Sequence, residues 1–364
     1  LKITKTKNNM KNNFSNKINN ASKSYTFDDV LLKPLFSSID RESISVETEI
    51  TKGSIFKIPF ISSPMDTVTD SKMAITMGRL GGLSIIHRNM SLEKQIAEVK
   101  KVLGTGCEVV AAIGPQDIEW GKKLHSETGL ELIVIDNAHA HTETMVRAIK
   151  EMKKIFKSVI VGNIATKEAV KGLIDAGADA IKVGIGAGSI CTTRVTTGVG
   201  VPQLSAIALV ADEASKYSIP VIADGGIRTG ADVAKALAVG ASSVVLGNVL
   251  AGTSDTPGEI VIVDNEKFKT YRGMGSLEAM KIGSKSRYNQ SYLNVDELVP
   301  EGVEGLTPYK GKTEDVVVQL VSYLKSTLFY CGSMTLKEFQ QKAEFVLMTN
   351  AGLIESHPHD ILQK

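Results

Sequence analysis

A stretch in the middle of the chain combines the residue types needed for nucleophilic chemistry on a bound ligand. It runs from Lys182 to Arg194 and reads KVGIGAGSICTTR. Its glycines let the backbone approach a ligand closely, and the hydroxyl of Ser189 with neighbouring amide N–H groups could hold a phosphate. Cys191 comes next and is followed by Thr192 and Thr193, and its thiol is placed for attack. The alternative is that Cys191 is a small buried hydrophobic residue, but the surrounding glycines and hydroxyls favour the reactive interpretation.

The elements around this stretch repeat in a regular order. Apolar, β-branched runs expected to be strands occupy residues 58–62, 83–87, 108–114, 132–137, 159–164, 180–186, 220–225 and 243–247. Amphipathic stretches expected to be helices lie between them, at 92–103, 142–156, 166–176, 205–216 and 231–239. Such alternation indicates βαβ units and a parallel sheet. Eight repeats predict a closed (β/α)8 TIM barrel and make a doubly wound open sheet the less favoured alternative.

Polar residues follow six of these predicted strands. Active sites of such barrels lie at the carboxyl ends of the strands, so these residues are candidates for the site. They are Ser63 and Met65 after the first strand, Asp136, Asn137 and Ala138 after the fourth, Asn163 at the end of the fifth, the Cys191 loop after the sixth, Asp224, Gly225 and Gly226 after the seventh, and Gly247 and Asn248 after the eighth.

Two of these strand ends predict a nucleotide site. Backbone N–H groups of Gly225–Gly226 and of Gly247–Asn248, each followed by a helix N-terminus, would suit a phosphate. Asp224 could accept hydrogen bonds from a ribose diol, or it could cap the following helix. Asp136 presents the same choice on another strand, where a second ribose could lie.

Other candidate residues carry weaker signals. His139 and His141 lack a third ligand and make a poor zinc site, so ordinary loop histidines are the preferred interpretation. Residues 264–307 are rich in Gly, Ser and charge and have no sustained period, which is typical of a lid or a disordered loop. This segment contains the pair Arg287–Tyr288. From spacing alone, the pair is best read as two surface residues.

The composition excludes several classes of protein. The 364 residues carry a net charge of +2 and show no basic stripe, which argues against nucleic acid as the main partner. No apolar run is long enough to span a bilayer. Three widely separated cysteines fit a reducing cytoplasm without a disulfide framework. Residues 1–24 are rich in Lys and Asn and are expected to be disordered, which leaves 25–364 as a single barrel domain with the flap 264–307 and a C-terminal extension 308–364.

These residues closely resemble the inosine-5′-monophosphate (IMP) dehydrogenase family over nearly the whole chain. The most specific stretches are 63–69, 184–194, 222–227 and 271–276. The resemblance implies an NAD-dependent oxidoreductase that converts IMP to xanthosine monophosphate in guanine nucleotide biosynthesis. Cys191 would form a covalent thioimidate with the purine, which is then hydrolysed. Arg287 on the flap would activate water beside Tyr288, a role that requires a site that stabilises the neutral guanidine, because the pKa of arginine lies above 12.

The resemblance also implies a set of binding residues in a potassium-dependent homotetramer. Those for the phosphate are Ser189, Gly226, Gly247, Asn248 and Tyr271; for the ribose and purine, Asp224, Gly225, Met274, Gly275, Glu301, Ser63 and Met65; for NAD, Asp136, Asn137, Ala138, Asn163, Gly184, Ile185 and Gly186; for potassium, carbonyls of Gly186, Gly188 and Cys191, with Glu355, Ser356 and His357 from a neighbouring subunit.

The chain departs from the family pattern at a few positions. Ala187 stands where the family usually has Pro, and Asn248 where it usually has Ser. Most members also carry a pair of CBS regulatory modules, and here the predicted helix 92–103 runs through residues 103–107 directly into the next strand. Two alternative functions remain: guanosine-monophosphate (GMP) reductase, which uses NADPH and shares the barrel and Cys loop, and a non-catalytic nucleotide-binding barrel with an inert Cys191.

Overall fold

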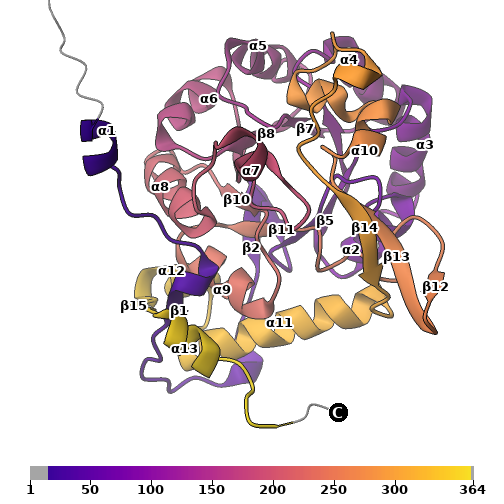
Figure 1. Ribbon diagram of the computed structural model, residues 1–364. Helices are drawn as coiled ribbons and strands as arrows, with labels where there is room; N and C mark the ends of the chain where they lie inside the picture. The colour runs from indigo at the N-terminus through magenta and orange to yellow at the C-terminus, as the bar shows by residue number, and fades with distance from the viewer. Residues whose placement is uncertain (1–14, 362–364) are drawn as a thin grey trace, which may run out of the picture.

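Eight parallel strands form a closed barrel, as the alternation predicts (Figure 1). We describe residues 15–361 of a computed structural model. The barrel strands are β4 (Phe60–Ser62), β5 (Leu83–Ile86), β6 (Val110–Ile113), β7 (Leu132–Asp136), β8 (Ser158–Ile164), β9 (Ala180–Val183), β10 (Val221–Asp224) and β11 (Ser243–Leu246). The barrel closes where β11 pairs in parallel with β4, so the carboxyl ends of all eight strands meet at one face.

Helices surround the barrel. They are α2 (Ser71–Arg79), α3 (Leu92–Leu103), α4 (Ile118–Thr128), α5 (Glu143–Met152), α6 (Val170–Ala176) with η3 (Lys167–Ala169), α8 (Gln203–Ser215), α9 (Gly230–Ala238) and α11 (Thr313–Tyr330). α11 lies between α9 and α2 and so takes the eighth helix position, although it comes after the flap in the sequence. The connection from α3 to β6 is residues 104–109 and holds no inserted domain. None of the described helices is long and apolar enough to cross a membrane.

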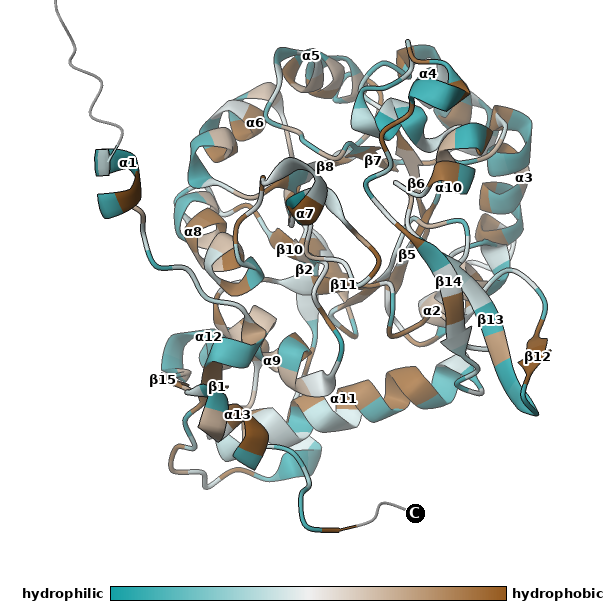
Figure 2. Cartoon of the chain, in the orientation of Figure 1, coloured by the Kyte–Doolittle hydropathy of each residue, from teal (hydrophilic) through white to brown (hydrophobic). Residues whose placement is uncertain are grey.

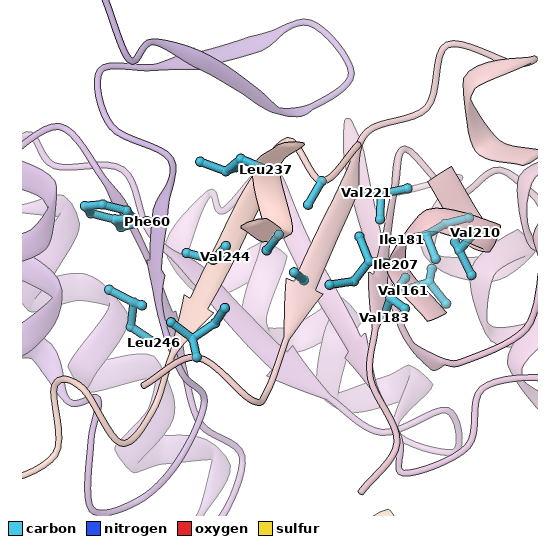
Figure 3. Packing of buried hydrophobic residues seen from close by; sticks show 14 of the residues in the cluster. Phe60, Val161, Ile181, Val183, Ile207, Val210, Val221, Leu237, Val244 and Leu246 are labelled. Atoms are coloured by element: carbon cyan, nitrogen blue, oxygen red, sulfur yellow. The ribbon is translucent and has the colours of Figure 1, made fainter. Parts of the chain in front are cut away.

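Each barrel strand buries both of its faces. Phe60, Val244 and Val221 point outward into the layer between strands and helices (Figure 3). Their neighbours along the strands, such as Ile61 and Val245, fill the barrel interior. Continuous apolar runs are typical of parallel strands that are covered on both sides, and burial of each aliphatic side chain contributes about 1.5–3 kcal/mol. The hairpin of β2 (Thr48–Thr51) and β3 (Ser54–Phe56) closes the interior with Ile50 and Phe56.

The flap is more ordered than its composition predicts. Its ends form β13 (Glu266–Arg272) and β14 (Glu304–Pro308), which pair antiparallel with each other and, through β13, with β12 (Val261–Val263). Between them lie α10 (Leu277–Ile282), η4 (Ser284–Tyr288) and η5 (Val295–Glu297). The expectation of one long loop is therefore wrong for the ends of the segment. The sequence pattern does not indicate strand β13, because the charged residue Lys269 occupies one of its buried positions. The amine of Lys269 donates to the Thr256 carbonyl at 2.5 Å.

A strand near the start of the described chain lies beside a strand near its end. β1 (Val30–Leu32) pairs antiparallel with β15 (Phe345–Leu347), beside η1 (Phe27–Asp29), α12 (Leu336–Lys342) and α13 (Asn350–Glu355) (Figure 1). η2 (Arg41–Ser43) and α7 (Thr193–Thr197) complete the elements, with α1 (Ser15–Asn19) at the start. Within residues 1–24, which are expected to be disordered, α1 is a single turn with no buried residue, and residues 1–14 lie outside the described part.

The hydropathy of the surface is uneven. β12 is an apolar edge strand at the tip of the three-stranded sheet (Figure 2). Its Ile262 is 69% exposed, and Ile354 on α13 is 70% exposed. The C-terminal extension is expected to pack on the barrel or on a neighbouring subunit. Its residues 355–361 are exposed in this chain, so they do not pack on their own barrel.

Candidate active site

Two adjoining cavities open at the carboxyl ends of the strands. They share Ser63, Met65, Ala187, Gly188, Asp224, Gly225 and Tyr271. The predicted residues that line the first cavity are Ser63, Met65, Ala138, Asn163, Gly184, Ile185, Gly186, Gly188, Cys191, Thr193, Asp224, Gly225, Tyr271, Met274, Gly275, Arg287, Tyr288 and Glu301. Ser189, Gly226, Gly247 and Asn248 line the second. Asp136 and Asn137 are buried and line neither cavity. Glu355, Ser356 and His357 are exposed and also line neither.

The Cys191 loop is built on glycine conformations. Gly184 ends β9 with φ +149°, and a Cβ there would lie 1.9 Å from the Asp224 carbonyl oxygen. Only glycine allows this approach between the two loops. Arg194 then ties the loop together, because its guanidinium donates to the carbonyls of Ile185 (3.1 Å) and Val201 (2.6 Å).

The thiol of Cys191 lies between its own loop and the far end of the flap. Its Sγ is 3.2 Å from Thr193 Oγ1 and 3.6 Å from the Glu301 carbonyl oxygen. Thr193 Oγ1 in turn donates to Glu301 Oε2 at 2.8 Å. An antiparallel bridge between Cys191 and Gly302 joins the two segments. A nucleophile, a hydroxyl and a carboxylate therefore form one contiguous hydrogen-bonded group.

The second cavity presents polar donors, among them the phenol of Tyr271 and the guanidinium of Arg228, which pairs with Asp28. Tyr271 comes from β13 and reaches the barrel mouth, where burial raises the pKa of its phenol to about 12. It therefore remains protonated at neutral pH and can donate. Lys310 donates to the carbonyl of Asn248 and supports that loop. The N-cap of α9 is Thr229, whose hydroxyl accepts from Asp232 N. Asp224 does not cap this helix, so the capping alternative for Asp224 is wrong.

Lys182 is a site residue that we did not predict from the sequence. Its side chain is completely buried, and its Nζ pairs with Asp136 Oδ1 at 2.9 Å and with Asp224 Oδ2 at 2.7 Å. Asn163 Nδ2 also donates to Asp224 Oδ2 at 2.9 Å. The sequence contains a signal that could have identified Lys182. This residue lies two residues from Ala180 in strand β9 and so shares the face of the strand that points into the barrel. A lysine that faces the interior of a barrel must be paired.

The flap covers the site, and its Arg287–Tyr288 pair is not a surface feature. The guanidinium of Arg287 forms an ion pair with Asp136, and Ala138 N donates to the Arg287 carbonyl at 3.0 Å. Burial lowers the pKa of Arg287, and the neighbouring Tyr288 partly opposes this shift. Burial raises the pKa of Tyr288 to about 12. The surface interpretation of this pair is wrong, because chain topology, not local sequence, brings η4 onto the ends of β7 and β8.

The remaining polar candidates lie outside the cavities. The rings of His139 and His141 are 6.3 Å apart, edge to face. Over residues 15–361, no three His, Cys, Asp or Glu side chains form a group placed to hold a metal ion.

Comparison with known proteins agrees with this geometry. A family model described as "IMP dehydrogenase / GMP reductase domain" matches residues 24–359. The chain is 46% identical to an inosine-5′-monophosphate dehydrogenase of Cryptosporidium parvum, over 94% of this chain and 96% of that protein. It is 41% identical to the protein of that name in Borreliella burgdorferi, over 92% and 96%. It is 38% identical to the one in Methanocaldococcus jannaschii, over 96% and 97%. This last alignment runs over 485 positions, so that protein contains residues with no counterpart among these 364.

Proposed function

Because this chain belongs to the IMP dehydrogenase / GMP reductase family, we propose that it catalyses the NAD-dependent oxidation of IMP to xanthosine monophosphate. One observation carries the proposal: Cys191 and the Arg287–Tyr288 pair of the flap line one cavity, which adjoins a second cavity lined by the phosphate-binding candidates. A protein that only binds a nucleotide would need neither the thiol of Cys191 nor the guanidinium of Arg287 on the flap. The other members of this family, the GMP reductases, would need the same thiol, and the curated relatives named above are all dehydrogenases.

We propose that IMP lies across both cavities. Its phosphate would accept hydrogen bonds from the donors of the second cavity, namely Ser189, Gly226, Gly247, Asn248 and Tyr271. Asp224, where the cavities meet, would bind the ribose diol. Met274, Gly275 and Glu301 line the first cavity with Cys191 and would surround the purine. This arrangement places C2 of the purine next to the thiol.

Two chemical steps follow from these positions. The Cys191 thiolate adds to C2, and the hydrogen on C2 leaves as hydride, which yields a covalent thioimidate. NAD, when bound, supplies the acceptor for that hydride. Water, deprotonated by Arg287 in the buried environment beside Tyr288, then attacks C2. The carbon–sulfur bond breaks, and xanthosine monophosphate and the Cys191 thiolate are released. The sum is IMP, NAD+ and water giving xanthosine monophosphate, NADH and a proton.

The residues proposed for NAD fit a dinucleotide. Asn137 Oδ1 and Asn163 Oδ1 are buried without a hydrogen-bond partner in the described part of the chain. Asp136 lies between them and Lys182 and carries a carboxylate that suits a ribose diol. Arg287 holds that carboxylate when the flap is closed. We therefore infer that the flap and the cofactor ribose bind Asp136 alternately.

An assay of the purified chain tests this function against its alternatives. IMP with NAD is expected to produce NADH, followed by absorbance at 340 nm. If GMP with NADPH reacts instead, the chain is a GMP reductase. If neither pair reacts and IMP still binds, the chain is a nucleotide-binding barrel and the catalytic proposal is wrong.

Removal of the Asp224 carboxylate is expected to weaken IMP binding selectively. In Asp224→Ala, the ribose loses a charged acceptor, which costs about 1.5–3 kcal/mol. NAD binding is expected to change much less, because Asp136 keeps its contact with Lys182. Isothermal titration with each ligand measures both effects. Equal losses for the two ligands would show that Asp224 has a structural role only.

We propose that potassium orders the Cys191 loop. The carbonyls of Gly186, Gly188 and Cys191 would supply oxygens from a single turn, but the Gly188 carbonyl also accepts from Cys191 N at 3.1 Å. One chain therefore offers an incomplete set. Because residues 355–357 are exposed and line neither cavity, we propose that they complete the site from a neighbouring subunit of a homotetramer.

Potassium is therefore expected to raise turnover several-fold over sodium without a change in fold. A loop with three glycines loses many conformations on ordering, and a cation held by its carbonyls selects one of them. Steady-state rates in matched potassium and sodium chloride, with circular dichroism as the control for folding, measure this effect. Identical rates in both salts would remove the cation from the proposal.

A further inference from the structure

A buried arginine outside the catalytic group contacts the flap. Arg88 follows β5, and its side chain is 10% exposed. Its Nη1 donates to Ser286 Oγ at 2.9 Å, one residue before Arg287, and pairs with Asp117 Oδ2 at 3.2 Å. Its Nη2 is buried and has no hydrogen-bond partner among residues 15–361. The guanidinium of Arg88 therefore links the barrel to the flap.

The barrel is shaped around this guanidinium. Gly114 N donates to Asp117 Oδ2 at 2.8 Å and fixes the carboxylate. A Cβ at Gly114 would lie 2.4 Å from Arg88 Nη1 and 2.7 Å from Asp117 Oδ2. Any other residue at position 114 would therefore push this ion pair apart. The pair is held by strand ends on the barrel side, and Ser286 is its contact on the flap side.

Burial of the Arg88 guanidinium is unfavourable, and its hydrogen-bond partners do not fully offset the free energy of desolvation. A buried charge needs good pairing and saturated hydrogen bonding to break even, and half of this guanidinium's terminal nitrogens lack a partner. Stability alone therefore does not explain Arg88. Its position next to Arg287 does have a consequence for the flap, because the repulsion between the two cations adds to burial in lowering the pKa of Arg287.

We propose that Arg88 is a positioning residue that holds the flap closed over Cys191 through Ser286, with Asp117 as its anchor. This inference rests on the proposed function. Closure places Arg287 against Asp136, which the cofactor ribose also needs. Loss of the Arg88–Ser286 contact therefore shifts the competition for Asp136 toward the cofactor and slows the hydrolytic step.

The test uses Ser286→Ala, which removes the flap's acceptor and leaves the Arg88–Asp117 pair in place. The initial burst of NADH is expected to keep its amplitude, and the steady-state rate to fall roughly ten- to hundredfold, as for loss of one hydrogen bond to a charged group. NAD is expected to inhibit at several-fold lower concentration.

Arg88→Ala is expected to show the same pattern. The double variant is expected to be no worse than Arg88→Ala, because the two side chains act through one contact. Ser291→Ala, an exposed serine on the same flap, is the matched control.

A second measurement does not depend on activity. Trypsin cleaves after Lys285 and Arg287, and cleavage there requires the flap to open. Both variants are expected to be cut several-fold faster than Ser291→Ala. Unchanged cleavage, or wild-type NAD inhibition in Ser286→Ala, would overturn the proposal. If the wild-type chain makes no NADH but both variants are cut faster than Ser291→Ala, the proposed function is wrong. The role of Arg88 in holding the flap closed would still be supported.

Discussion

Cys191→Ser is expected to abolish turnover while IMP still binds within about tenfold of the wild-type affinity. Serine keeps the size and hydrogen-bonding capacity of the side chain, but its hydroxyl is a far poorer nucleophile than a thiolate. The contacts proposed for the phosphate and ribose do not involve the sulfur. Isothermal titration with IMP and a steady-state NADH assay measure binding and turnover separately.

The other two cysteines provide matched controls. Cys107 lies near the Ile75 carbonyl on the helical side of the barrel, and Cys331 is buried at the end of α11. Serine at either position is expected to leave turnover within about threefold, because neither lines the two cavities. Turnover of Cys191→Ser above a few per cent of wild type would contradict the nucleophile assignment.

The barrel could be predicted from the sequence because its signal is local. Each strand is a short β-branched run buried on both faces, and its length and β-branched content mark it as a strand. The helix 92–103 coincides with α3 at both ends. α2 and α4 were not predicted, and the eighth helix position is taken by α11, whose place depends on the path of the flap. Only contacts distant in sequence reveal such an arrangement.

The site was predictable to the extent that it depends on the ends of strands. The fold rule brings Asp136, Asn163 and Asp224 to one face whatever their local signals. Lys182 was not predicted because a strand lysine usually marks a solvent-exposed position. The functional interpretation of Arg287 came from the family resemblance, because spacing alone indicated a surface residue. Its contact with Asp136 joins positions 151 residues apart, which no local pattern encodes.

The ion pairs of the site link the two ligand positions in one chain of charges. Asp224, Lys182, Asp136 and Arg287 alternate in sign from the proposed IMP ribose to the flap. When Arg287 leaves, Lys182 remains the partner of both carboxylates. Asp136 then has an acceptor free for the cofactor ribose. On the proposed placement of the cofactor ribose, the site would hold either the cofactor or the closed flap, and each proposed chemical step needs only one of them.

Arg287→Ala is therefore expected to separate the two steps. Hydride transfer takes place with the flap away from Asp136, so it should remain nearly intact. Hydrolysis needs the base that we propose for Arg287, and loss of a general base typically costs about 10²–10⁴-fold in rate. The covalent Cys191 adduct should then accumulate, seen as a burst of NADH fluorescence followed by a slow steady state after rapid mixing. Arg287→Lys keeps a cation opposite Asp136 and serves as the control for flap closure without the guanidine. A variant that loses the burst itself would show that Arg287 acts in substrate binding or hydride transfer, because only a residue confined to the second step can spare the first.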